Sequence, residues 1–165
     1  MKKLYLVRHA KSSWKNPDLR DFDRPLNSRG KRDAPFMGKL LREKGIKPNT
    51  FITSPALRAL TTAIYFAEEL EYPEEKILRD ENLYDADVMD ILNVLSAVKN
   101  KNESIMVFTH NPGLTNFCNY ISDQYIENIP TSAVVSLVLK VDQWNELDEK
   151  SCTTEFFEYP KKYFK

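Results

Sequence analysis

The chain has 165 residues, of which 42% are apolar and 29% charged, the composition of an ordinary globular protein with a sizeable core. We therefore expect a single domain over residues 1–165. Lys plus Arg number 24 and Asp plus Glu number 24, so the formal net charge is zero. Because a neutral chain has no overall field that attracts nucleic acid or an anionic membrane, we expect neither as a partner.

Cysteine usage and hydropathy bear on the compartment. Cys118 and Cys152 lie far apart and outside any CxxC motif. Two cysteines cannot supply the disulfide framework of a small secreted domain, so we interpret both as free thiols. The first apolar run, residues 4–7, is too short for a signal peptide, and no stretch approaches the ~20 apolar residues of a membrane span. We expect a cytoplasmic protein.

Short runs with β-type composition alternate with helical periods along the chain, a pattern typical of α/β proteins. The run SIMVFT at 104–109 is unbroken and apolar, as expected for a central parallel strand. Ser28 and Asn111 are placed to cap two helices. In chain order, we predict strands at 4–7, 50–53, 76–78, 104–109, 133–141 and 153–158, a long loop at 11–27, and helices at 29–44, from Pro55, at 87–99 and from Pro112.

These elements predict a three-layer sandwich, in which a mostly parallel central sheet carries helices on both faces. The last two strands follow each other without a helix between them, so we expect an antiparallel pair at the edge of the sheet. In open α/β sheets, ligands bind beyond the carboxyl ends of the strands. We therefore expect the functional residues at that edge.

The carboxyl ends of three predicted strands lead into His or Arg side chains. Strand 4–7 runs directly into Arg8 and His9, and strand 104–109 runs into His110. Strand 50–53 precedes a helix that presents Arg58 in its first turn. Both histidines of the chain thus follow a strand.

This set of residues suggests chemistry on a tetrahedral oxyanion. Arginine offers a planar fork of donors that matches phosphate oxygens, and helix N-termini add backbone N–H groups. Neutral imidazole is a competent nucleophile near neutral pH, because its reference pKa is about 6.5. A catalytic zinc would want a third protein ligand, and Arg8 and Arg58 would repel it. We expect no metal and no cofactor, since the Gly-rich nucleotide motifs are also missing.

Three motifs resemble those of the histidine phosphatase superfamily, whose fold is that of phosphoglycerate mutase. LVRHA at 6–10 resembles its RHG signature, with Ala10 in place of the commoner Gly. SPALRA at 54–59, with threonines at 61 and 62, resembles SPxxRAxxT, and FTH at 108–110 resembles its strand-end histidine. The short length and the DRPL run at 23–26 are similar to the SixA-type phosphohistidine phosphatases within that superfamily.

The resemblance implies roles for the matching positions. His9 is expected to be the nucleophile that becomes phosphohistidine. Arg8, Arg58 and a protonated His110 are expected to hold the phosphoryl group. In larger members an acidic residue protonates the leaving group, and Glu81 is the best positional match.

Two of these residues have alternatives that the sequence leaves open. Asp80 is adjacent to Glu81, and Asp85 and Asp87 follow closely, so a neighbouring carboxyl group could act as the acid instead. Arg24 could bind the phosphoryl group or the peptide around it, or it could pair with Asp21 or Asp23 within the loop.

The resemblance implies a metal-independent phosphatase that works through a phosphohistidine on His9, with a phosphohistidine-bearing protein as the expected substrate. A short chain without a lid leaves its site open, which suits a phosphorylated protein side chain. Two alternatives remain: a phosphatase or mutase on small phosphate esters, and a non-catalytic phosphate-binding module. The presence of both histidines and a candidate acid argues against the module.

Overall fold

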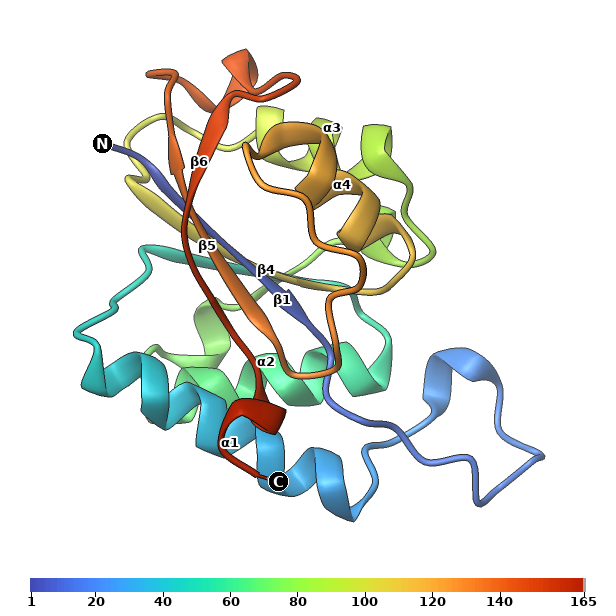
Figure 1. Cartoon of the computed structure of the whole chain (residues 1–165). Coiled ribbons are helices and arrows are strands. Elements are labelled where there is room, and N and C mark those ends of the chain that lie inside the picture. The colour runs from blue at the N-terminus through green and yellow to red at the C-terminus, as the bar shows by residue number, and fades with distance from the viewer. Residues whose placement is uncertain (165) are drawn as a thin grey trace.

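A computed structural model describes residues 1–164 and contains one mixed six-stranded sheet in the order β3-β2-β4-β1-β5-β6 (Figure 1). Strands β1 to β4 are mutually parallel, β5 is antiparallel to β1, and β6 is antiparallel to β5. The predicted antiparallel pair is confirmed, with β6 at the edge and β5 one position inside it. The strands are β1 Lys3–Arg8, β2 Thr50–Thr53, β3 Leu78–Arg79, β4 Ser104–Thr109, β5 Val134–Leu139 and β6 Cys152–Glu158.

Helices cover both faces of this sheet, which confirms the predicted three-layer α/β sandwich. Figure 1 shows α1 and α2 together on one face and α3 and α4 together on the other. The helices are α1 Ser28–Glu43, α2 Leu57–Glu69, α3 Val88–Ser96 and α4 Gly113–Ile121. We continue to predict a single domain over residues 1–165, because one sheet joins the two helical layers.

Strand β1 shows why the central strands are apolar without interruption. Leu4 and Leu6 pack into the core that α3 and α4 cover, whereas Tyr5 and Val7 pack into the core beneath α1 and α2. All four side chains are buried. Alternate residues of a strand point to opposite faces, so a strand covered on both sides needs apolar residues at every position.

The starts of two helices differ from the sequence prediction. The cap of α1 is Asn27 rather than Ser28, because the Asn27 side chain accepts a hydrogen bond from the Gly30 N–H at 2.9 Å. Helix α2 begins at Leu57, two residues beyond Pro55. Both shifts are of one or two residues, which is the ordinary uncertainty in assigning the end of a helix.

The later elements also shift at their ends. Strand β3 lies at 78–79 rather than 76–78, because residues 74–76 form a 3₁₀ turn. Helix α3 ends at Ser96 and starts from a capping box made by Asp87 and Asp90. Helix α4 begins at residue 113, although the Asn111 side chain still accepts from the Thr115 N–H at 3.1 Å.

Two further expectations concern the cysteines and membrane-spanning segments. Cys118 and Cys152 are both free and buried, as predicted. Within residues 1–164, no helix combines the length and apolarity needed to cross a bilayer.

Gly30 lies where α1 passes over the chain that leaves β1. A Cβ atom on this residue would lie 2.2 Å from the carbonyl oxygen of Lys11, a backbone atom that cannot turn aside. Lys11 comes two residues after His9, and its carbonyl also accepts from the Asn27 N–H at 3.0 Å. The close approach of Gly30 to Lys11 therefore fixes the path of the chain just after His9.

We expect Gly30→Ala to lower the free energy of unfolding by about 1–3 kcal/mol, because the added methyl group must displace backbone. Urea denaturation measures this change. Ser28→Ala, an exposed substitution in the same helical turn, is the control and should leave the free energy of unfolding nearly unchanged. Equal stability of Gly30→Ala and wild type would contradict the close approach.

Candidate active site

The predicted strand-end residues lie together at the carboxyl ends of β1 and β4. Arg8 is the last residue of β1 and pairs in register with Thr109, so His9 and His110 follow on neighbouring parallel strands. Their ring centroids are 5.1 Å apart. Arg58, the second residue of α2, is 6% exposed, and each histidine is 7% exposed. The structure thus brings together the four residues that the motifs singled out.

The tautomer of His9 is set by the backbone carbonyl of the next residue, Ala10. Nδ1 lies 2.7 Å from the carbonyl oxygen of Ala10, and a carbonyl can only accept, so Nδ1 carries the proton and Nε2 carries the lone pair. Burial lowers the pKa of His9 to about 3; the Ala10 hydrogen bond opposes the shift, and His110, Arg58 and Arg8 add to it. The ring is therefore neutral at physiological pH, with Nε2 available as a nucleophile.

Thr62 connects the residue after His9 to the helix that carries Arg58. Its hydroxyl oxygen accepts a hydrogen bond from the Ala10 N–H at 2.8 Å, and its own O–H donates to the Arg58 carbonyl at 2.7 Å. Both hydrogen bonds are buried. The motif match has both Thr61 and Thr62 near its last position, and the structure selects Thr62.

Ser54 is a site residue whose role the sequence did not predict. Its hydroxyl lies 2.7 Å from Nε2 of His110 and accepts from the Ala56 N–H at 3.3 Å. Within residues 1–164 the Ser54 hydroxyl proton has no acceptor other than Nε2 of His110, and its donation to Nε2 leaves the imidazole proton on Nδ1. His110 Nδ1 then becomes a donor that faces no acceptor within residues 1–164.

His110 is neutral in the free protein, and the protonated ring expected around a bound phosphoryl group stays a prediction. Burial, reinforced by the charge of Arg58, lowers its pKa to about 3, with Asp21 opposing the shift. As a neutral ring with a proton on Nδ1, His110 still offers a hydrogen bond to an anion.

Three buried donors define the place for an anion. Arg8 Nε, Arg58 Nε and His110 Nδ1 are all buried and have no hydrogen-bond acceptor in residues 1–164. A different atom of the Arg8 guanidinium fixes its position, because Nη1 donates to the Ile129 carbonyl at 3.0 Å. Unpartnered buried donors are costly in a folded protein, and an oxyanion offers the acceptor oxygens that these donors lack.

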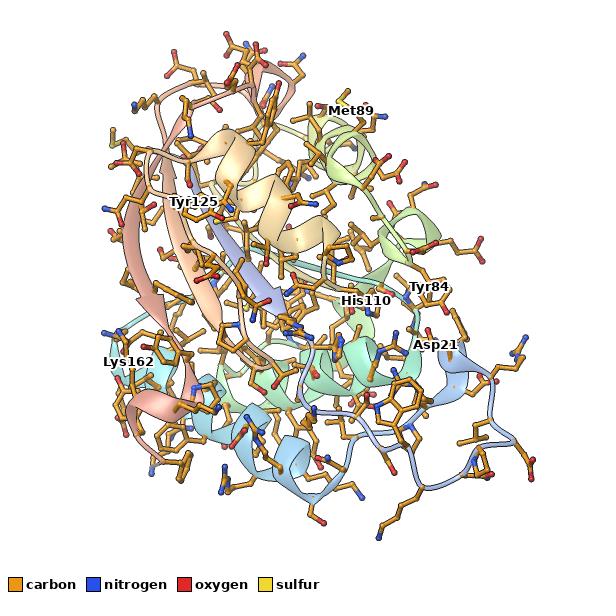
Figure 2. The ribbon with its side chains drawn as sticks, turned by 45° about the vertical axis from the view of Figure 1, so that its right-hand side comes forward. Asp21, Tyr84, Met89, His110, Tyr125 and Lys162 are labelled. Atoms are coloured by element: carbon orange, nitrogen blue, oxygen red, sulfur yellow. The ribbon has the colours of Figure 1, made fainter. Side chains whose placement is uncertain are left out.

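Asp21, in the loop after β1, contacts Arg58 from the solvent side. Its Oδ2 lies 2.9 Å from Arg58 Nη2 and accepts from the Tyr84 hydroxyl at 2.7 Å. Tyr84 in turn packs edge-on against His110, with ring centroids 5.6 Å apart. Figure 2 shows Asp21, Tyr84 and His110 near one another at the same end of the molecule. No sequence motif pointed to Asp21 or Tyr84 as site residues.

Arg24 belongs to the loop rather than to the three unpartnered donors. It pairs with Asp21, at 3.1 Å between Nη2 and Oδ1, and donates to the Ser12 hydroxyl. Its guanidinium also lies 3.6 Å from the centre of the Trp14 ring, a cation–π contact. Of the alternatives that the sequence left open, the structure contains the ion pair with Asp21; Asp23 pairs with Arg20 instead.

Glu81 is not brought into contact with the histidines or arginines. It begins a 3₁₀ turn after β3 and is exposed, and within residues 1–164 its carboxylate makes no hydrogen bond or ion pair with them. The turn itself is anchored near the site, because the Thr109 hydroxyl donates to the Leu83 carbonyl at 2.7 Å. Asp80 caps the turn through the Asn82 N–H.

The sheet order and the paired strand-end histidines define the class of phosphoglycerate mutase-like α/β proteins. A model of the histidine phosphatase superfamily (branch 1) matches residues 4–94, more than half of the chain. The chain therefore belongs to the histidine phosphatase superfamily.

Solved structures agree on the fold. A protein from Agrobacterium tumefaciens described as a SixA phosphohistidine phosphatase aligns with a TM-score of 0.83 and 24% identity, over 96% of this chain and 98% of that one. The protein histidine phosphatase SixA complexed with tungstate gives a TM-score of 0.83 and 21% identity, over 97% and 98% of the two chains. At these identities the likeness establishes a SixA-like fold.

Sequence relatives are more mixed. An uncharacterized chloroplast protein of Arabidopsis thaliana is 28% identical over 153 residues, which is 88% of this chain and 70% of the relative. Phosphoglycerate mutase 1 of Saccharomyces cerevisiae is 40% identical over 65 residues, which is 38% of this chain and 26% of the mutase. Since this chain covers only a quarter of that mutase, the match does not extend the mutase's activity to it.

The lowered histidine pKa values make stability depend on pH. Between about pH 5 and pH 6.5, the unfolded chain protonates both His9 and His110, whereas the folded chain, with pKa values of about 3, leaves them neutral. Stability should therefore fall as the pH falls, with a slope that approaches two protons, or about 2.7 kcal/mol per pH unit. Urea denaturation across this range measures the slope.

His9→Asn removes one titrating group and should reduce that slope by about one proton. A variant whose free energy of unfolding changes with pH as steeply as wild type would contradict the burial of a neutral His9.

Proposed function

We propose that this phosphatase acts through a phosphohistidine formed on His9 and that its substrates are phosphohistidine-bearing proteins. The observation that carries the proposal is the hydrogen bond from His9 Nδ1 to the Ala10 carbonyl. It leaves Nε2 of a neutral, buried imidazole as the lone-pair nitrogen, beside donors that have no partner. Superfamily membership supports the phosphatase activity, and the substrate and residue roles are our inference.

In the first step, Nε2 of His9 attacks phosphorus in line. The new P–N bond forms as the bond to the leaving group breaks, and its electron pair stays with the leaving group. Arg8 Nε, Arg58 Nε and His110 Nδ1 donate to the equatorial oxygens, where charge develops. Phosphorylation makes the His9 ring cationic, and the Ala10 carbonyl stabilises that charge through Nδ1–H.

In the second step, water attacks the phosphorus of phospho-His9. The P–N bond breaks, its electron pair returns to Nε2, and inorganic phosphate leaves. The ring is again neutral and ready for another cycle, because the Ala10 carbonyl has kept the proton on Nδ1 throughout.

The position of Glu81 supports a nitrogen leaving group. An alkoxide needs a proton from a well-placed acid, whereas imidazole needs far less help because it protonates near neutral pH. Within residues 1–164, Glu81 is exposed and makes no hydrogen bond or ion pair with His9 or His110. We retain it as the candidate acid for ester substrates, for which it would have to approach the leaving group.

The free, buried cysteines fit a reducing compartment, so we also propose a cytoplasmic location. Small phosphate esters are the second candidate substrate class, favoured by the partial sequence match to phosphoglycerate mutases.

The test is release of inorganic phosphate with EDTA present, from a phosphohistidine protein and from p-nitrophenyl phosphate. Wild type should release phosphate without metal and prefer the phosphohistidine protein. His9→Ala should lose about 1000-fold or more in rate, because no other side chain supplies the nucleophile. Met89→Ala, an exposed substitution on α3, should keep full activity.

Preference for p-nitrophenyl phosphate would favour the small-ester alternative. A folded wild type that releases phosphate from neither substrate, yet binds phosphate, would indicate the binding module instead.

A further inference from the structure

Arg58 is held along one edge of its guanidinium group. Nη1 donates to the Asp21 carbonyl at 2.7 Å, and Nη2 donates to the Asp21 carboxylate at 2.9 Å. The other edge is formed by Nε and the second proton of Nη2, and Nε is buried without an acceptor in residues 1–164. A guanidinium can serve two acceptors on its two edges at once. Asp21 therefore occupies one edge of Arg58 and leaves the other for a phosphoryl group.

Asp21 is a permanent negative charge at this position. Burial by itself would raise its pKa, but hydrogen bonds from Tyr84, Arg58 and Arg24 outweigh that effect and lower the pKa to about 2. Its side chain is 49% exposed, whereas that of Arg58 is 7% exposed. The carboxylate thus lies on the solvent side of the arginine, where the rest of a bound substrate must project.

The nearby cation is already engaged. Arg24 is buried, pairs with Asp21 at 3.1 Å and stacks on Trp14. It is therefore not available to bind a second anionic group of a substrate. Arg20, farther along the loop, pairs with Asp23.

From these contacts we propose that Asp21 is a specificity-determining residue that disfavours substrates carrying a second anionic group next to the phosphoryl group. This inference rests on the proposed function, and it narrows the substrate class to phosphoryl groups on neutral or cationic carriers. Such carriers include the imidazole of phosphohistidine. Small metabolites with a carboxylate or a second phosphate would be repelled by Asp21, since like charges a few ångströms apart repel even near a protein surface.

The test uses two esters of similar size that differ in one carboxylate. Glycerol 3-phosphate and 3-phosphoglycerate are measured as competitive inhibitors of p-nitrophenyl phosphate hydrolysis. Wild type should bind glycerol 3-phosphate more tightly. Asp21→Asn keeps an oxygen for Arg58 and removes the charge, so it should narrow the ratio of the two inhibition constants by about fivefold. Asp23→Asn, a matched loss of charge two residues away, should leave the ratio unchanged.

A purely structural role for Asp21 would weaken both inhibitors by the same factor and leave their ratio unaltered, which would overturn the proposal. Salt gives an independent check that needs no variant. Raising the ionic strength should narrow the wild-type ratio, because screening weakens repulsion at an exposed carboxylate, and a ratio insensitive to both salt and Asp21→Asn contradicts the role. Absence of phosphate release by wild type would instead refute the proposed function.

Discussion

The hydrogen bond between His9 Nδ1 and the Ala10 carbonyl is the interaction on which the site depends. Burial keeps the ring neutral, and the carbonyl decides which nitrogen keeps the proton. The Ala10 N–H is fixed in turn by Thr62, which belongs to the same helix as Arg58. One short chain of buried hydrogen bonds therefore connects the His9 ring to the backbone of Arg58, and we propose that it orients both for phosphoryl transfer.

The sheet supplies the rest of the geometry. Because β1 and β4 are parallel neighbours in register, the residues that follow them emerge side by side, and the two imidazole rings come within 5.1 Å. Burying two imidazole rings and two guanidinium groups together costs solvation free energy. In the free protein, part of this cost is the loss of hydrogen bonds at the buried donors of Arg8, Arg58 and His110. In the proposed mechanism, the phosphoryl group meets donors that are already oriented before it arrives.

The sequence predicted the sandwich and the four central residues because both follow from local signals: apolar runs for buried strands, and His or Arg side chains that follow those strands directly or in the first turn of the next helix. It did not predict Asp21 or Tyr84 as site residues, since Asp21 contacts Arg58 across 37 positions of the chain and Tyr84 contacts Asp21 across 63. Nothing in local periodicity encodes such contacts. Glu81 shows a different limit of sequence-based prediction. Its position along the chain matches that of the family's acid, yet its carboxylate makes no hydrogen bond with either histidine within residues 1–164.

The most direct test of the account is nitrogen NMR of the protein labelled with ¹⁵N on histidine, which is simple here because the chain has only two histidines. The account predicts that one ring, assigned to His9 by its absence in His9→Asn, shows a protonated Nδ1 and an unprotonated Nε2. Those signals should stay unchanged from about pH 5 to pH 8, since burial lowers the pKa of His9 to about 3. A ring that titrates near its reference pKa of about 6.5, or that carries its proton on Nε2, would contradict the central claim.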